Sequence, residues 1–252
     1  MFEPAAVNVA TPCYGDDAMK RVVAVLVAGI VAVIGAALLI DVPSSPTSPP
    51  PVTEVITTTV VETTVAEPSL LDSLEVKGRA SRSDYDRAEF GQAWSDDVRV
   101  DGGRNGCDTR NDILRRDLTD PVIRPGTHGC LVESGTLHDP YSGEILEFVR
   151  GERSAEVQID HIVALADAWQ KGAQAWDEDT RRDFANDPLN LLAVDGSLNQ
   201  QKGAGDAATW LPPNKAFRCD YATRIVEVKV TYGLWVTAAE RDALARELMR
   251  CP

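Results

Sequence analysis

The residues best suited to chemistry lie close together past the middle of the chain. Asp160 and His161 are neighbours inside an apolar run. Asn190 lies in a second apolar run, and Asn199 precedes Lys202 by three residues in a segment that predicts a helix. Hydrolysis of a phosphodiester bond needs an activated water, a charge that binds the phosphate, and assistance to the leaving oxygen. One divalent cation held among these residue types would meet those needs.

The type of each of these residues suggests a chemical role. His161 belongs to the residue type whose ordinary pKa lies near neutrality, so it suits a general base. Asp160 and Asn199 carry oxygen atoms that suit a hard cation, Mg²⁺ or Mn²⁺ rather than zinc. Successive side chains of a regular strand point to opposite faces, so Asp160 and His161 cannot easily share one metal. The strand must therefore bend or end at this pair.

The hydrophobic pattern predicts the elements that position these residues. Residues 156–163 alternate and are rich in β-branched side chains, which predicts a strand. Residues 164–172 and 181–185 predict two helices, and residues 189–194 predict a second strand. Ser197 is expected to cap a helix that begins near Leu198. The predicted order is strand, helical insertion, strand, helix.

The pair Asp160-His161, followed by Asn-x8-Asn-x2-Lys, resembles the motif of the HNH endonucleases. The motif covers residues 158–202, and residues 85–251 more loosely resemble exported actinobacterial proteins of that family. The resemblance implies an α+β fold with a strand-strand-helix (ββα-metal) core and flanking helices. It implies that Asp160 and Asn199 bind the metal and that His161 is the base. The last motif position is Asn199 here instead of the His in the family's name.

Three further residues complete the predicted site. The resemblance gives Asn190 a mainly structural role, in which it ties a loop and orients the catalytic base. Lys202 shares a helix face with Asn199 and could hold a phosphate oxygen, or it is a solvated helix residue. Arg110, in a Cys-Asp-Thr-Arg-Asn-Asp segment, could bind a substrate phosphate, or it forms a structural salt bridge with a neighbouring aspartate.

Elements after the motif are expected to frame the core. Residues 214–230 predict a helix, and Thr237-Ala-Ala-Glu240 is a capping box that opens a last helix ending at Arg250. Four tryptophans are expected to pack in the core or at its rim rather than to stack on bases: Trp169, Trp176, Trp210 and Trp235.

The chain is acidic, with a formal net charge of −14. From Leu71 onward there are 23 Lys and Arg against 32 Asp and Glu, a difference of −9. Nucleic-acid binders are usually basic, and this acidity argues against a long electrostatic footprint on DNA. A locally positive cleft is still compatible with an acidic body. Its candidate residues are Arg110, Arg115, Arg116, Arg181, Arg182 and Lys202.

The first seventy residues do not have the pattern of a globular domain. Residues 1–21 are predicted as a short cytoplasmic N-terminus, and residues 22–40 as an uncharged apolar segment just long enough to span a bilayer. Lys20 and Arg21 precede this segment, so the positive-inside bias places the rest outside. The segment is a signal anchor or, if Met19 is the true start, a cleaved signal peptide. Residues 41–70 predict a disordered Pro/Thr-rich stalk, and residues 71–252 the nuclease-like domain.

Four of the five cysteines lie in the predicted exported domain, where disulfides persist. Four cysteines allow three pairings, and sequence order favours Cys107–Cys130 and Cys219–Cys251 because each pair closes a local loop. The second pair would attach the C-terminal helix. A zinc site is the alternative, although the chain has no Cys-x2-Cys pair.

The sequence therefore predicts a metal-dependent endonuclease outside the cytoplasmic membrane. It would hydrolyse phosphodiester bonds of nucleic acid, with DNA favoured over RNA as the substrate. A water activated by His161 and one divalent metal, Mg²⁺ or Mn²⁺, would carry out the reaction. The protein would be attached to the membrane through residues 22–40, or secreted if the signal is cleaved. The alternative is a non-catalytic envelope binding module that retains the HNH fold, which the acidic charge favours.

Overall fold

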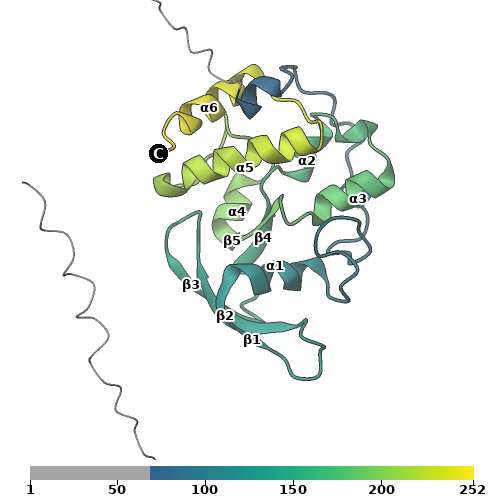
Figure 1. The fold of residues 1–252 in the computed structure, drawn as a ribbon, viewed down its shortest axis with the longest axis vertical. Helices are drawn as coiled ribbons and strands as arrows, with labels where there is room; N and C mark the ends of the chain where they lie inside the picture. Colours follow the sequence, from purple (N-terminus) through teal and green to yellow (C-terminus); the bar gives the residue numbers. More distant parts are fainter. Residues whose placement is uncertain (1–68) are drawn as a thin grey trace, which may run out of the picture. The chain divides into compact units, whose positions relative to one another are not determined.

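The two strands that carry the motif pair with each other. β4 (Val157–His161) and β5 (Leu191–Asp195) form an antiparallel two-stranded ribbon, in which Asp160 lies opposite Leu192. α4 (Gly196–Lys202) follows β5 directly. The computed structural model describes residues 69–252, and this strand-strand-helix unit lies near the middle of Figure 1.

The segment between β4 and β5 is helical, as the sequence predicts. It contains α2 (Leu165–Trp169), a 3-10 turn η3 (Ala173–Ala175) and α3 (Glu178–Asn186). All five residues of α2 are buried. Asp177 caps α3 by accepting a hydrogen bond from the backbone N–H of Thr180 at 2.7 Å. The insertion therefore returns the chain to β5 as packed helices rather than as an open loop.

The cap of α4 differs from the sequence prediction. Asp195, not Ser197, is the N-cap, and its Oδ1 accepts from the backbone N–H of Leu198 at 2.8 Å. The helix begins at Gly196, where an added Cβ would collide with the carbonyl oxygen of Ala155. The tight packing at Gly196 joins strand to helix without a loop, so the last strand residue does the capping.

A second sheet, which was not among the predicted elements, packs beside the ribbon. α1 (Thr109–Asp117) leads into β1 (Leu118–Ile123), β2 (Val132–His138) and β3 (Ile145–Val149), which form an antiparallel sheet in that order. A register shift interrupts the pairing of β1 with β2, and β3 exposes Ile145 and Val149, so neither strand has a clear alternating pattern. The buried face of this sheet packs with α1 and with Val157 and Ile159 of β4.

A larger core lies on the helical side of the ribbon. It gathers residues from α2, α3 and β5 around the C-terminal helices α5 (Arg218–Thr231) and α6 (Ala238–Leu248). The predicted helix 214–230 is present as a 3-10 turn η4 (Lys215–Phe217) followed by α5. Two short 3-10 turns precede the core in the chain, η1 (Leu70–Ser73) and η2 (Arg87–Phe90).

The predicted capping box at the start of α6 is only half formed. Thr237 accepts a hydrogen bond from the backbone N–H of Glu240 at 3.2 Å. The Glu240 carboxylate does not return to Thr237, because it lies inside the protein against Lys171 and Lys229. α6 ends at Leu248 rather than at Arg250.

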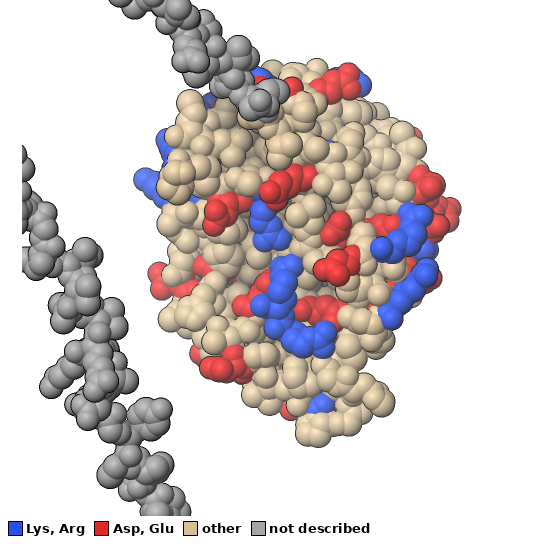
Figure 2. Space-filling view, in the orientation of Figure 1, with Lys and Arg blue, Asp and Glu red and all other residues tan. Residues whose placement is uncertain are grey.

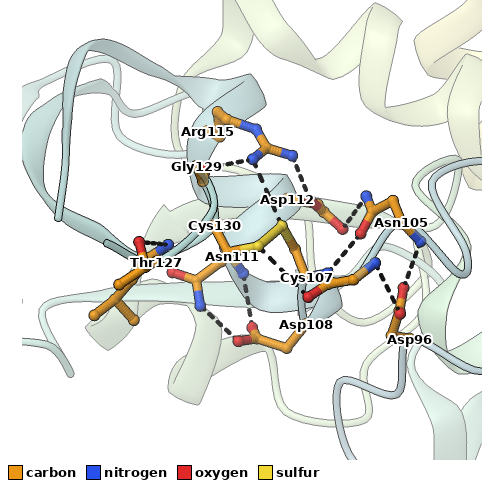
Figure 3. Close-up of a disulfide and its surroundings, with 12 residues drawn as sticks. Asp96, Asn105, Cys107, Asp108, Asn111, Asp112, Arg115, Thr127, Gly129 and Cys130 are labelled. Atoms are coloured by element: carbon orange, nitrogen blue, oxygen red, sulfur yellow. Dashed lines mark hydrogen bonds and ion pairs between the residues drawn. A yellow bond between two sulfur atoms is a disulfide. The ribbon is translucent and has the colours of Figure 1, made fainter. Parts of the chain in front are cut away.

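Both predicted disulfides are present. Cys107–Cys130 joins the residue before the cap of α1 to the loop between β1 and β2, and Figure 3 shows Asn105, Asp108 and Arg115 around it. Cys219–Cys251 attaches the C-terminus to α5. The zinc alternative for these cysteines is therefore wrong, since their thiols are consumed by the disulfides.

The predicted membrane segment, residues 22–40, lies outside the described residues. So does the predicted stalk up to residue 68. Within residues 69–252, no helix combines the length and apolar character that a membrane crossing requires.

Candidate functional site

A polar cavity of about 290 Å³ adjoins the end of β4. Asp160 and His161 line it from the strand, and Asn199 lines it from α4. Arg82 and Arg87 line it from the segment before and within η2. The fold thus brings the predicted base and both predicted metal ligands to one cavity, which we call the polar cavity.

His161 is held as a neutral imidazole. Its Nε2 lies 2.9 Å from the carbonyl oxygen of Ala185. A carbonyl only accepts hydrogen bonds, so Nε2 carries the ring proton and Nδ1 has a lone pair. Burial lowers the pKa of His161 from 6.5 to about 3, against the Ala185 hydrogen bond and with help from the charges of Arg87 and Lys202. The imidazole is therefore unprotonated at neutral pH and can accept a proton at Nδ1, but its lowered pKa makes it a weaker base than an exposed histidine.

Asp160 is buried and bound by two side chains of the protein. Its Oδ2 accepts from the Tyr141 hydroxyl at 2.5 Å and from Lys202 Nζ at 2.8 Å, and its Oδ1 accepts from the same Nζ at 3.0 Å. Burial, and then the negative charge of Asp160, raise the pKa of Tyr141 well above its ordinary value. The Tyr141 hydroxyl thus stays protonated and donates to the carboxylate.

Lys202 lies inside the protein rather than on its surface. Its side chain is fully buried, and Nζ also donates to the carbonyl oxygen of His161 at 2.7 Å. The alternative of a solvated helix residue is therefore wrong. Lys202 does not line the polar cavity, so in this geometry it orients Asp160 and the end of β4 rather than holding a phosphate oxygen.

Asn190 ties together the two ends of the insertion. Its Oδ1 accepts from the backbone N–H of Val163 at 2.8 Å, and its Nδ2 donates to the carbonyl of Val163 at 3.2 Å. Its backbone carbonyl accepts from Ile162 at 2.8 Å. These contacts fix the chain directly after His161 and agree with a structural role for Asn190.

Two side chains at the polar cavity, Asp160 and Asn199, carry oxygens of the kind that binds a hard cation. Asn199 donates through Nδ2 to Gln158 Oε1 at 2.9 Å, and its Oδ1 accepts no hydrogen bond within residues 69–252. Asp160 offers Oδ1, whose one hydrogen-bond partner among residues 69–252 is Lys202. Two protein oxygens suit Mg²⁺, which usually keeps several waters and takes further oxygens from a phosphate. In the described part of the chain, no three His, Cys, Asp or Glu side chains are grouped to hold a metal.

The predicted positive cleft is not formed by the residues that we expected. Arg110 donates to the carbonyls of Ser154 and Val157 at 3.3 and 3.1 Å, so it supports the chain that enters β4. These contacts match neither a phosphate site nor the alternative salt bridge, and phosphate binding by Arg110 stays a prediction. Four other candidates are paired with carboxylates and do not line the polar cavity: Arg115, Arg116, Arg181 and Arg182.

Arg82 and Arg87 were missed by the sequence analysis. Both are exposed, both line the polar cavity, and neither forms an ion pair within the described residues. The Arg82 guanidinium lies 5.1 Å from the ring centre of Tyr85. The only sequence signal was the spacing Arg-x2-Tyr-x-Arg. It lies more than seventy residues before the motif, so no local pattern connects the two.

The charges visible on the surface do not form a broad basic face. Figure 2 shows Lys and Arg side chains interspersed with Asp and Glu on the face that is drawn. At the polar cavity itself, the arginines among the lining residues are Arg82 and Arg87.

Two comparisons place this arrangement among known proteins. A family model described as "GmrSD restriction endonucleases, C-terminal domain" matches residues 108–247, which include β4, β5 and α4. An uncharacterized secreted protein of Arthroderma benhamiae is 35% identical over 185 residues, covering 73% of this chain and 83% of that protein. The family match therefore spans most of the described domain and includes Asp160, His161 and Asn199, whereas Arg82 and Arg87 of the polar cavity lie before it.

Proposed function

Because the chain belongs to the family of the C-terminal domains of GmrSD restriction endonucleases, we propose that it is a metal-dependent endonuclease whose polar cavity hydrolyses a nucleic-acid phosphodiester bond. The family match supports an endonuclease function at the coarse level. The metal, the preference for DNA and the residue roles are our proposal.

The observation that carries the proposal is the state of His161. It is neutral, its Nε2 donates a hydrogen bond to the Ala185 carbonyl, and its Nδ1 has no hydrogen-bond partner within the described residues. In the reaction, Nδ1 takes a proton from a water as the water oxygen attacks phosphorus. The bond from phosphorus to the leaving sugar oxygen then breaks, and that oxygen takes a proton from solvent water. General-base assistance of this kind contributes roughly 10²–10⁴-fold to a rate.

The other groups of the cavity bind and orient the substrate. Arg82 and Arg87, which form no ion pair in the part of the chain that the structure describes, offer cationic donors to the phosphate oxygens. Tyr141 and Lys202 hold the Asp160 carboxylate in place, and Asn190 holds the backbone after His161. A divalent cation bound by Asp160 and Asn199 would supply Lewis-acid stabilisation of the charge on the phosphate.

We place this activity outside the cytoplasm. The relative from Arthroderma benhamiae is described as secreted, and the two disulfides suit an oxidising compartment. Attachment to a membrane through residues 22–40 stays a prediction.

A non-catalytic binding module is the second candidate, and one observation favours it. Lys202 already balances the charge of Asp160, which weakens the attraction of that carboxylate for a cation. The neutral His161 favours the enzyme, because a binding module has no use for a buried base beside a polar cavity.

DNA cleavage by the full chain tests the proposal. Supercoiled plasmid and circular single-stranded DNA are incubated with the protein in Mg²⁺, in Mn²⁺ or in EDTA. We expect metal-dependent cleavage, with a loss of roughly 10²–10⁴-fold in His161→Ala. His138→Ala is the matched control, because His138 is exposed and does not line the polar cavity.

Two results would contradict the proposal in different ways. Cleavage by His161→Ala at the wild-type rate would show that His161 is not the base. A folded wild-type protein that binds nucleic acid and never cleaves it, in either metal, would be the binding module.

A further inference from the structure

A second cavity, of about 230 Å³, also has His161 in its wall. We call it the apolar cavity. Its further wall residues include Phe90, Trp94, Leu165, Ala185 and Asn186. His161, Arg87 and Leu165 line both cavities, so a ligand in one adjoins a ligand in the other. None of the candidate roles above uses the apolar cavity.

Trp94 gives this cavity an aromatic wall. It is half-buried, and its ring is nearly parallel to that of His161, with an angle of 14° and 6.0 Å between ring centres. Its φ of 60° is in the left-handed region, which is rare for a bulky side chain and concentrates at ligand sites. The Trp94 carbonyl accepts from the backbone N–H of Thr109 at 3.3 Å, which links it to the start of α1.

Asn186 adds an unused polar group to the wall. It ends α3, and it is 2% exposed. Its Nδ2 donates to the carbonyl of Arg182 at 2.9 Å, while its Oδ1 is buried with no hydrogen-bond partner in the described residues. A buried acceptor without a partner is costly, so native proteins retain few of them. A ligand that carries an amino group would satisfy it.

We propose that the apolar cavity binds one nucleobase of the strand whose phosphate lies in the polar cavity, an inference that rests on the proposed nuclease function. The base stacks on Trp94, and its exocyclic amino group donates to Asn186 Oδ1. Arg87, on the wall common to both cavities, contacts the phosphate of the same nucleotide or its neighbour. The cavity is smaller than the roughly 300–1,000 Å³ of drug-sized ligand sites, so it takes a single base.

The proposal identifies the class of substrate. A base can enter this cavity only when it has left the duplex stack, so the preferred substrate is a single strand or an unpaired nucleotide. Stacking on an aromatic side chain gives affinity without a long electrostatic footprint. That matches a domain with 23 Lys and Arg against 32 Asp and Glu, whose visible face intersperses both charges (Figure 2).

Binding without cleavage tests the proposal. The full chain is titrated in EDTA into a fluorescently labelled single-stranded DNA, the same sequence as RNA, and the DNA duplex. We expect Trp94→Ala to weaken binding of the single strands about tenfold and to leave duplex binding unchanged. Trp235→Ala is the matched control, because Trp235 is equally half-buried and lines neither cavity. It should bind both forms as the wild type does.

A second variant covers the case in which Trp94→Ala does not fold. Ala93 is exposed and lines the cavity, so Ala93→Leu fills space from the surface without loss of a packed side chain. We expect the same selective loss of single-strand binding. If folded Trp94→Ala and Ala93→Leu both bind single strands as the wild type does, the base site is wrong.

The cleavage assay keeps the two proposals apart. If Trp94→Ala weakens single-strand binding but the wild type never cleaves, the base site is supported and the nuclease proposal is refuted. If the wild type cleaves and neither variant changes single-strand binding, the nuclease proposal is supported and the base site is refuted.

Discussion

Two clusters of polar and charged side chains lie largely inside this domain, and they differ in what they leave unpaired. One adjoins the polar cavity: Asp160 and His161 line the cavity, and the buried Lys202 pairs with Asp160. The other, which we call the charge network, joins α2, α5 and α6. Its members are Arg79, Asp167, Lys171, Asp206, Lys229 and Glu240. None of these six lines the polar or the apolar cavity.

The charge network is balanced within itself. Lys171 Nζ lies 2.6 Å from Asp167, 2.8 Å from Asp206 and 2.7 Å from Glu240. Burial lowers the pKa of Lys171, but the three carboxylates outweigh it and the pKa is raised above its ordinary value. Its three cations pair with its three carboxylates, so few charged groups remain available to bind a ligand.

The residues around the polar cavity are of similar kinds, but several of their hydrogen-bonding and charged groups remain available for a ligand. Asp160 and Lys202 pair, but His161 Nδ1 and Asn199 Oδ1 have no partner within residues 69–252, and Arg82 and Arg87 form no ion pair there. The two clusters therefore differ in the donors and acceptors that they leave unused rather than in the presence of buried charge.

The largest expected effect is on the charge network. Lys171→Met leaves three carboxylates short of a partner inside the protein, and breaking a buried pair in this way costs on the order of 3–5 kcal/mol. Denaturant unfolding measures the loss. Arg79→Gln is the control, because Arg79 contacts two of the same carboxylates but is 33% exposed, so solvent screening limits its cost to about 1 kcal/mol.

The cleavage activity of Lys171→Met provides a second test of the same comparison. The rate of cleavage per folded molecule should be unchanged in Lys171→Met under stabilising conditions. A folded variant with a rate reduced more than about tenfold would break the comparison, because the charge network would then contribute to catalysis.

The next effect is on stability at acidic pH. The pKa of His161 is lowered to about 3 in the folded protein from 6.5, so the unfolded state binds the proton more readily. Its contribution is present above pH 6.5 and is lost as pH falls toward 3. Between pH 6.5 and pH 5 this amounts to about 2 kcal/mol for the metal-free protein.

The measurement is denaturant unfolding in EDTA across this pH range, with His161→Asn beside the wild type. The variant should lose less stability on acidification. Parallel curves for the two proteins would show that His161 is not buried as a neutral ring.

The smallest effect separates substrate binding from folding. Arg87→Ala should lower kcat/KM for cleavage about tenfold, as loss of a charge-assisted hydrogen bond to phosphate would, with no change in unfolding. The effect should weaken as salt is raised. Arg246→Ala is the control, since Arg246 is exposed on α6, forms no ion pair in the described residues and lines neither cavity. Equal kcat/KM for both variants would remove Arg87 from the site.

The sequence determined the local units of the site. The alternation through residues 156–163, the insertion and the second apolar run predicted β4, the helices and β5, because each of these hydrophobic patterns is complete within a short stretch of chain. Cysteine order likewise predicted both disulfides, which close local loops. The sequence did not predict the irregular sheet β1-β2-β3, because its register shift and its exposed apolar residues obscure the alternation of buried and exposed side chains.

Only the tertiary structure decided which side chains meet. Tyr141 reaches Asp160 from the segment between β2 and β3, and Arg82 and Arg87 reach the same cavity from before α1. Lys202 turns inward because the buried carboxylate of Asp160 needs a cation, which spacing along α4 cannot reveal. Contacts between distant segments depend on how whole elements pack, so a local sequence pattern indicates the candidate residues of the site, while the packing decides which side chains they contact.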